Sequence, residues 1–119
     1  MIMFCATVRG FDVPEEILAL LEKDGHFHIK KERRYFYSSN NFRTHVTEEI
    51  DAVLEQVLAF SEQYTDIFRA ISNNGGNVEL YITFYSRTSG GFCLPCSTIK
   101  RLSELNMSIG IDGMLPVSS

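Results

Sequence analysis

Apolar and polar residues alternate without a break between Val78 and Tyr85, and this pattern restricts the fold more than any other in the chain. A two-residue period is typical of a β-strand whose two faces meet different surroundings. One face should lie in a core, and it carries Val78, Leu80, Ile82 and Phe84. The opposite face should be partly solvated, and it carries Glu79, Tyr81, Thr83 and Tyr85.

The rest of the chain divides into shorter segments with strand or helix periodicity. The other expected strands cover residues 2–9, 27–37 and 107–112, and the expected helices cover approximately residues 14–23, 47–63, 65–72 and 97–106. We interpret this order as an α+β fold, a ferredoxin-like sandwich with a mixed, mostly antiparallel sheet and helices on one face. A helical insertion would separate two β-α-β halves. The length fits a single domain over residues 1–119, with a loose tail from about residue 115.

The charge balance and the cysteines limit the class of protein. The 15 acidic and 11 basic side chains give a formal net charge of −4, which argues against general nucleic-acid binding. No apolar run approaches the ~20 residues that cross a bilayer, and the N-terminus lacks the positively charged start of a signal peptide. Three cysteines, an odd number, indicate reduced thiols. We therefore expect a cytoplasmic protein without nucleic-acid or membrane partners.

The predicted helices between residues 47 and 72 carry many carboxylates on their outer face. A solvated helix face is the simpler interpretation. The functional interpretation is a docking surface for a basic protein, because complementary charge accelerates encounter. Tyrosines would anchor such a contact if they are exposed. The candidate partner-binding residues are Glu48, Glu49, Asp51, Glu55, Glu62 and Asp66, with Tyr64, Tyr81 and Tyr85 as anchors.

The thiols of Cys93 and Cys96 have the C-x-x-C spacing, with Pro95 before the second cysteine. A helix N-terminus stabilises a thiolate, so Cys93 could act as a nucleophile and Cys96 as its resolving partner. The arrangement resembles the thioredoxin active site, which also needs a later cis-proline loop. In this chain the later proline is Pro116, in the predicted tail. The alternative is a pair of small apolar side chains at a helix start.

A metal site would have to combine Cys5, His26, His28 and His45. His26 and His28 would share one face of a strand, a spacing that can chelate zinc. Because no second spaced pair completes a finger-like pattern, we expect neither a metal nor another cofactor.

The basic run Lys30–Arg34 precedes three aromatic residues, Tyr35–Tyr37. On a single strand the basic side chains would divide between two faces, so they would protect a solvated edge from aggregation. The alternative is a basic and aromatic surface for nucleic acid, which the overall acidity opposes.

Four segments resemble the bacterial family called domain of unknown function 4279, and the resemblance covers nearly the whole chain. The segments are Gly10–Ile17, Tyr35–Ser39, Val46–Leu58 and Leu102–Asp112. The family has no established activity, so the resemblance implies no catalytic residue. Small bacterial proteins of this type resemble the immunity partners of secreted toxins.

Together these features predict a non-enzymatic immunity protein that neutralises a cognate bacterial toxin, such as a basic nuclease, by tight one-to-one binding. Two other functions stay open. One is a thiol-disulfide redox protein that uses Cys93 and Cys96, and the other is a small-ligand-binding regulatory domain. The oligomeric state does not follow from the sequence.

Overall fold

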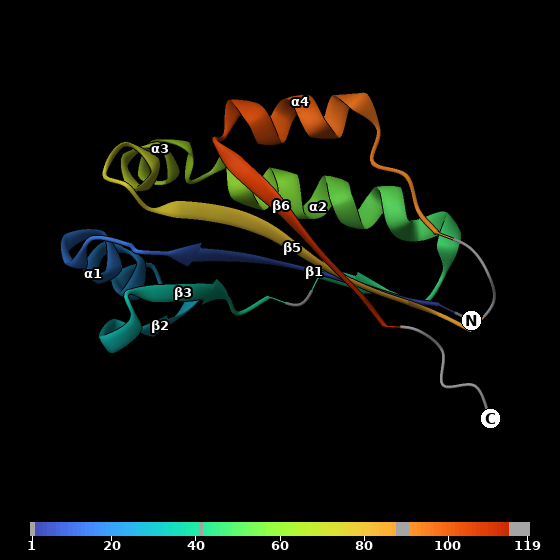
Figure 1. Ribbon diagram of the computed structural model, residues 1–119, viewed down its shortest axis with the longest axis horizontal. Helices are drawn as coiled ribbons and strands as arrows, with labels where there is room; N and C mark the ends of the chain where they lie inside the picture. Colours follow the sequence, from blue (N-terminus) through green and yellow to red (C-terminus); the bar gives the residue numbers. More distant parts are fainter. Residues whose placement is uncertain (1, 41, 88–90, 115–119) are drawn as a thin grey trace.

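The computed structural model describes residues 2–40, 42–87 and 91–114. In these residues the strands are β1 Ile2–Phe11, β2 Phe27–Lys30, β3 Tyr35–Ser38, β4 Phe42–Thr44, β5 Asn77–Ser86 and β6 Met107–Met114 (Figure 1). The helices are α1 Glu15–Asp24, α2 Ile50–Glu62, α3 Thr65–Asn73 and α4 Cys96–Glu104, with 3-10 turns η1 Lys31–Arg33 and η2 Thr47–Glu49. The predicted tail from about residue 115 lies outside the described residues.

The strands of the described residues join one mixed sheet in the order β2-β3-β1-β5-β6. The central strand, β1, pairs antiparallel with β5 along its whole length. Its other edge pairs antiparallel with β4 near its beginning and with β3 near its end. β6 runs parallel to β5. The predicted α+β class with a mixed sheet is confirmed.

The helices connect strands that are not neighbours in the sheet. Because β1 and β2 both run antiparallel to β3, they are parallel to each other, and α1 makes the crossover between them. The pair α2 and α3 carries the chain from β4, on one edge of β1, to β5 on the other. α4 then connects β5 to the parallel strand β6. Figure 1 shows α2, α3 and α4 on the same side of the sheet.

The segment 27–37, predicted as one strand, is instead a hairpin, so that prediction is wrong. η1 makes the turn, and Arg34 after it has a left-handed backbone with a φ of 52°. The backbone N–H of Val13 donates to the carbonyl oxygen of Arg34 at 3.0 Å, and Nε of Arg34 donates to the carbonyl oxygen of Val13, also at 3.0 Å. A tertiary contact therefore stabilises a backbone conformation that costs free energy for a non-glycine residue.

The core lies between the helices and one face of the sheet. The alternation predicted for residues 78–85 is confirmed, because Val78, Leu80 and Ile82 are buried, although Phe84 is only half-buried. β1 contributes alternate residues to the same face. Its buried side chains, and those that the helices place above them, are Phe4, Ala6 and Val8 from β1, Leu18 and Leu21 from α1, Val57 and Leu58 from α2, and Phe68 and Ile71 from α3.

Gly10 lies on the core face of β1, opposite Phe36 of β3. A Cβ atom added to Gly10 would lie 2.1 Å from Cε2 of the Phe36 ring. This ring packs edge-on against Phe27, with centroids 5.1 Å apart, and stacks on Phe68 at 6.3 Å. Gly10 thus leaves the space that the Phe36 ring needs to contact both Phe27 of β2 and Phe68 of α3.

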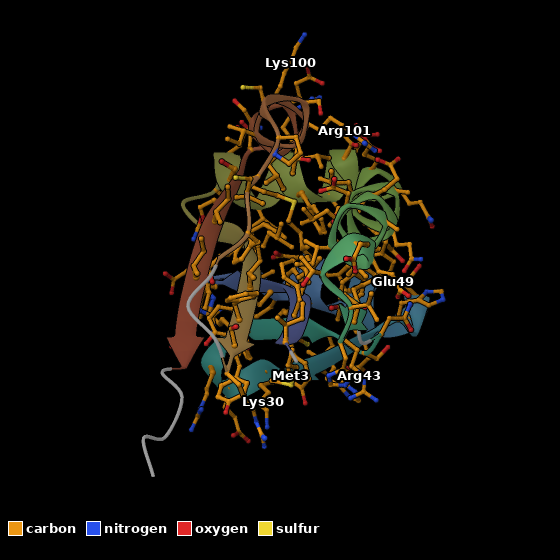
Figure 2. All side chains as sticks on the ribbon, turned by 90° about the vertical axis from the view of Figure 1, so that its right-hand side faces the viewer. Met3, Lys30, Arg43, Glu49, Lys100 and Arg101 are labelled. Carbon is orange, nitrogen blue, oxygen red and sulfur yellow. The ribbon has the colours of Figure 1, made fainter. Side chains whose placement is uncertain are left out.

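The opposite face of the sheet points away from α2, α3 and α4. In Figure 2, Met3, Lys30 and Arg43 lie on that side, whereas Lys100 and Arg101 of α4 lie at the other end of the molecule. We call this surface the open face. No helix in the described part of the chain is long and apolar enough to cross a membrane.

Candidate functional site

A depression of about 560 Å³ opens at the beginning of α2. The carboxylates of Glu48 and Asp51 lie on it, and neither has a hydrogen-bond or ion-pair partner among the described residues. We call it the α2 depression. The residues that line it are Thr47, Glu48, Ile50, Asp51, Gly91, Phe92 and Cys93. Two unpaired carboxylates beside apolar surface would suit a cationic side chain with an aliphatic stem.

Phe92 fixes the wall of the α2 depression opposite the helix. Its ring meets Phe4 edge-on with centroids 5.2 Å apart, and it lies 5.0 Å from the ring of Phe84. These contacts attach the segment before α4 to the end of the central strands. The side chain of Phe92 is half-buried, and Ile50 is buried at the start of α2. The depression therefore has an apolar base and acidic margins.

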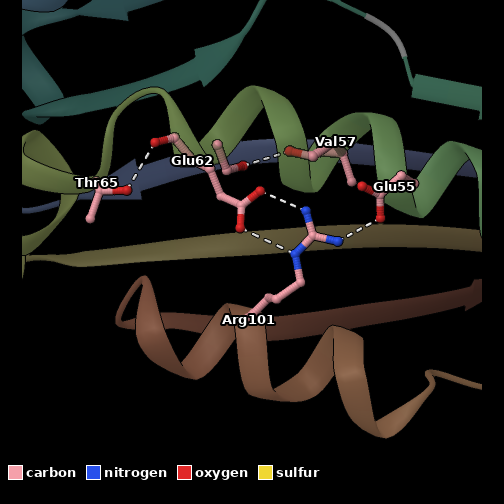
Figure 3. Close-up of polar contacts among 6 residues, drawn as sticks. Glu55, Val57, Glu62, Thr65 and Arg101 are labelled. Atoms are coloured by element: carbon pink, nitrogen blue, oxygen red, sulfur yellow. Dashed lines mark hydrogen bonds and ion pairs between the residues drawn. The ribbon is translucent and has the colours of Figure 1, made fainter.

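Two of the predicted acidic residues, Glu55 and Glu62, bind Arg101 of α4 (Figure 3). Nη1 of Arg101 donates to Glu55 Oε2 at 2.5 Å, and Nη2 and Nε donate to the two carboxylate oxygens of Glu62 at 2.6 and 3.1 Å. The hydrogen bonds from Arg101 hold the pKa of Glu62 below its ordinary value. These two carboxylates join α2 to α4 and share the single positive charge of Arg101.

The remaining predicted carboxylates lie apart from the α2 depression. Oε2 of Glu49 accepts a hydrogen bond from Thr44 Oγ1 at 3.0 Å, which links η2 to β4. Asp66 is exposed in the first turn of α3. Of the six acidic candidates, Glu48 and Asp51 are thus the two that line the α2 depression.

Tyr64, predicted as a surface anchor, is buried, with 6% of its surface exposed. Its ring packs against Phe27 and Phe60, with centroids 5.0 and 5.3 Å away. Its hydroxyl donates to Oδ2 of Asp24 at 2.6 Å, and Nδ1 of His26 lies 2.8 Å from the same oxygen. The ring of Tyr64 belongs to the core, and only its hydroxyl end approaches the surface.

The contact between Tyr64 and Asp24 changes the proton affinity of both groups. Burial, together with the hydrogen bond to Asp24, raises the pKa of Tyr64. The hydrogen bond from Tyr64, followed by the contact with His26, lowers the pKa of Asp24. A carboxyl group with a depressed folded-state pKa stabilises the protein above its unfolded-state pKa, and this stabilisation is lost as the pH falls through the folded-state value.

Replacement of Tyr64 by phenylalanine should therefore lower the free energy of unfolding at pH 7 by about 1 kcal/mol. The difference from the wild-type protein should begin to shrink below about pH 4, near the unfolded-state pKa of an aspartate, and should disappear as the pH falls through the lower folded-state pKa of Asp24. Urea unfolding at neutral and acidic pH measures this. The matched control is Tyr85→Phe, because the hydroxyl of Tyr85 has no hydrogen-bond partner among the described residues. An equal difference at both pH values would show that the Asp24 contact does not contribute.

Tyr81 and Tyr85 lie on the open face, away from α2. The hydroxyl of Tyr81 donates to Oδ2 of Asp112 at 2.8 Å, and this hydrogen bond raises the pKa of Tyr81. The guanidinium of Arg9 lies 3.8 Å from the centre of the Tyr81 ring. Tyr81 and Tyr85 therefore lie on the opposite side of the sheet from the predicted acidic residues of α2 and α3.

The sulfur atoms of Cys93 and Cys96 are exposed and are not joined in a disulfide. α4 begins at Cys96, with Pro95 as its N-cap residue, so Cys93 lies three positions before the helix. Only Cys96 thus lies in the first turn of α4, where the backbone N–H groups have no partner within the helix. Cys93 instead lines the α2 depression.

The histidines do not converge. The ring of His26 lies beside Phe60 of α2, 6.5 Å between centroids, whereas the ring of His28 packs on Tyr37 at 4.8 Å, on the open face. Nδ1 of His45 lies 3.1 Å from the carbonyl oxygen of Ile2. Cys5 is half-buried on β1. The described residues contain no group of three or more histidine, cysteine, aspartate and glutamate side chains that could hold a metal ion.

Comparison with known proteins decides the family. A family model described as Domain of unknown function (DUF4279) matches residues 10–115, nearly the whole chain. The chain belongs to the DUF4279 family. No curated protein and no solved structure matches it. The matched residues contribute to both faces of the sheet, and they include every residue that lines the α2 depression.

Four residues of the α2 depression were not predicted as site residues, namely Thr47, Ile50, Gly91 and Phe92. The pattern predicts Thr47 and Ile50 as the start and the inner face of an amphipathic helix. In the structure Thr47 begins the 3-10 turn η2, and Ile50 is buried at the start of α2. Phe92 follows a glycine pair, and nothing in its local sequence indicates contact with Phe4, far away in the chain. A search for acidic residues within one helical turn of a buried helix start would have selected Glu48 and Asp51 together with Glu49, which binds Thr44 instead.

Proposed function

We propose that this DUF4279 protein is a non-enzymatic protein-binding domain, and specifically an immunity protein that neutralises a cognate bacterial toxin by direct association. The observation that carries the proposal is the α2 depression, with its two unpaired carboxylates above an apolar base. A lysine or arginine of the toxin would enter the depression, with its charge at Glu48 and Asp51 and its stem against Phe92. The domain would then cover an active site or a substrate groove.

The class of toxin that fits best is one with a cationic groove. A nuclease binds the phosphates of its substrate with arginine and lysine side chains, and these would be attracted to a protein with net charge −4. The proposal includes action in the bacterial cytoplasm, which the three free cysteines support, because thiols stay reduced there.

Co-expression with the product of the adjacent open reading frame tests the proposal. We expect the neighbouring product to arrest growth when it is expressed alone, and the DUF4279 protein to restore growth through a stable complex. A neighbour without toxicity, or toxicity that persists without any complex, would rule out the immunity function.

Charge reversal tests the surface. The double substitution Glu48→Lys/Asp51→Lys should weaken the complex by roughly 100-fold, since it replaces two attractions by two repulsions. The matched control is Glu16→Lys/Glu104→Lys, which makes the same change in net charge at exposed positions of α1 and α4. Surface plasmon resonance at several salt concentrations would measure both variants. Equal affinity of the two would place the contact elsewhere.

A further inference from the structure

A second depression, of about 310 Å³, lies on the open face of the sheet. Two arginines and two aromatic side chains line it, and we call it the aromatic-arginine depression. They are Arg9 and Phe11 from the end of β1, Arg33 from η1 and Tyr35 from β3. The hairpin of β2 and β3 explains this arrangement, because its turn, η1, brings Arg33 to the end of β1.

Aromatic rings form a row across the open face from β1 to β2. Phe11 and Tyr35 lie 5.2 Å apart between centroids, Tyr35 and Tyr37 lie 5.9 Å apart, and Tyr37 and His28 lie 4.8 Å apart. Phe11, Tyr35 and Tyr37 are half-buried, so part of each ring faces solvent. Such rings offer π-faces to a planar aromatic ligand.

The two arginines of this depression differ in what they already bind. Nε of Arg9 donates to Oε1 of Glu79 at 2.5 Å, and the guanidinium lies between the rings of Tyr81 and Phe11, 3.8 and 5.0 Å from their centres. Arg9 is thereby fixed and its charge is compensated. Arg33 is exposed and has no hydrogen-bond or ion-pair partner among the described residues. Its guanidinium is free to bind an anion through two parallel hydrogen bonds.

The aromatic-arginine depression carries basic side chains, although the chain as a whole is acidic. Lys30 lies opposite Tyr35 in the pairing of β2 with β3, and Figure 2 shows its side chain on the open face. Of the nearby carboxylates, Glu79 is paired with Arg9, Glu32 is an exposed neighbour of Arg33 within η1, and Asp12 is exposed and follows Phe11. Most of the acidic residues of α2 and α3 lie on the helix side, so the net charge of −4 conceals a segregation between the two sides.

We propose that the aromatic-arginine depression binds a nucleotide, with the base stacked on Tyr35 and Phe11 and the phosphate held by Arg33. A volume of about 310 Å³ is at the small end of ligand sites and is suited to one base with its sugar and phosphate. The aromatic pair accounts for the planar part of the ligand, and the unpaired guanidinium for its anionic part. This site is on the opposite side of the sheet from the α2 depression, so the inference goes beyond the proposed function and does not rest on it.

NMR titration of the full chain with adenosine 5′-monophosphate, adenosine and inorganic phosphate tests the proposal. We expect the nucleotide to shift the amide signals of η1, β3 and the end of β1 at roughly millimolar concentration. Adenosine alone and phosphate alone should each bind about tenfold more weakly, because each keeps one half of the recognition. If inorganic phosphate binds as tightly as the nucleotide, the site recognises only an anion, and the proposal is wrong.

Two substitutions examine the assigned roles. Arg33→Ala should weaken nucleotide binding roughly tenfold, whereas Lys100→Ala, which removes an exposed charge on the far side of α4, should leave it unchanged. Tyr35→Leu, which keeps an apolar side chain at this position, should weaken it by about fivefold or more. If neither Arg33→Ala nor Tyr35→Leu alters the titration, or if an acidic peptide shifts these signals and the nucleotide does not, the proposal is wrong.

A short single-stranded oligonucleotide distinguishes the two sources of a nucleotide. A free nucleotide is the natural ligand if the oligonucleotide binds no more tightly than adenosine 5′-monophosphate. A strand is the ligand if the oligonucleotide binds about tenfold more tightly and Arg43→Ala weakens the oligonucleotide alone, since further phosphates would then reach the other basic side chains. Either result supports a site that recognises a base and a phosphate. If neither the nucleotide nor the oligonucleotide binds, the proposal is wrong.

Discussion

Replacement of Phe36 by alanine is expected to lower the free energy of unfolding by about 3–5 kcal/mol. The side chain is fully buried, and its ring fills the space between Phe27, Phe68 and the bare backbone of Gly10. Alanine would remove the apolar surface and leave a cavity that a sheet strand cannot close, because the pairing of β3 with β1 and β2 fixes the backbone. Urea unfolding followed by circular dichroism measures the change.

The control for Phe36→Ala is Tyr35→Ala, one residue earlier on the same strand. Tyr35 is half-buried on the open face, so its loss should cost roughly half as much or less. Both variants remove a ring from β3 and change its strand propensity similarly, so their difference isolates burial in the core. Comparable destabilisation by the two variants would contradict the assignment of Phe36 to the core face.

Replacement of Gly10 by alanine is expected to destabilise the protein by about 3 kcal/mol, at the upper end of the usual range for overpacking. The added Cβ would lie 2.1 Å from the Phe36 ring, closer than carbon atoms can approach. The ring cannot turn aside without moving against Phe27 of the neighbouring strand β2 and Phe68 of α3, which both pack on it. Chemical denaturation at constant pH, with the slope of the transition compared between variants, gives the change.

A double-substitution cycle tests the cause. In the Phe36→Ala background the space above residue 10 is empty, so Gly10→Ala should cost at least about 1 kcal/mol less than in the wild-type protein. The control is Gly113→Ala on β6, where an added Cβ meets nothing within 4 Å, and we expect a change within about 0.5 kcal/mol. Additive effects at positions 10 and 36 would mean that glycine is needed there for another reason.

Most elements could be predicted from periodicity because their patterns are local. Val78, Leu80 and Ile82 alternate with polar residues and form the predicted core face of β5. The long apolar stripe of residues 47–63 forms α2 with its buried face as expected. In these segments the same residues that favour the backbone geometry also supply the buried surface, so local and tertiary preferences agree.

Segment 27–37 could not be predicted in this way. Its alternation of charged and apolar residues is typical of one long strand, but the chain reverses at η1 and places Arg34 in a left-handed conformation. The hydrogen bonds of Arg34 to Val13 make that turn stable, and Val13 belongs to a different part of the chain. The three-residue strand β4 was missed for the same reason, since its pairing with β1 defines it.

The sequence by itself determined the α+β class, the family and the chemistry at hand, namely an excess of carboxylates, a basic run beside aromatic residues and three free thiols. Only the tertiary structure decided which of these groups act together. It paired Glu55 and Glu62 with Arg101, placed the ring of Tyr64 in the core, and left Glu48 and Asp51 unpaired beside Phe92. It also brought Arg33 over Phe11 and Tyr35 on the open face. Side-chain type and helix or strand preference act over a few residues, whereas whether a charge is paired or a ring is buried depends on segments that meet only when the sheet has formed.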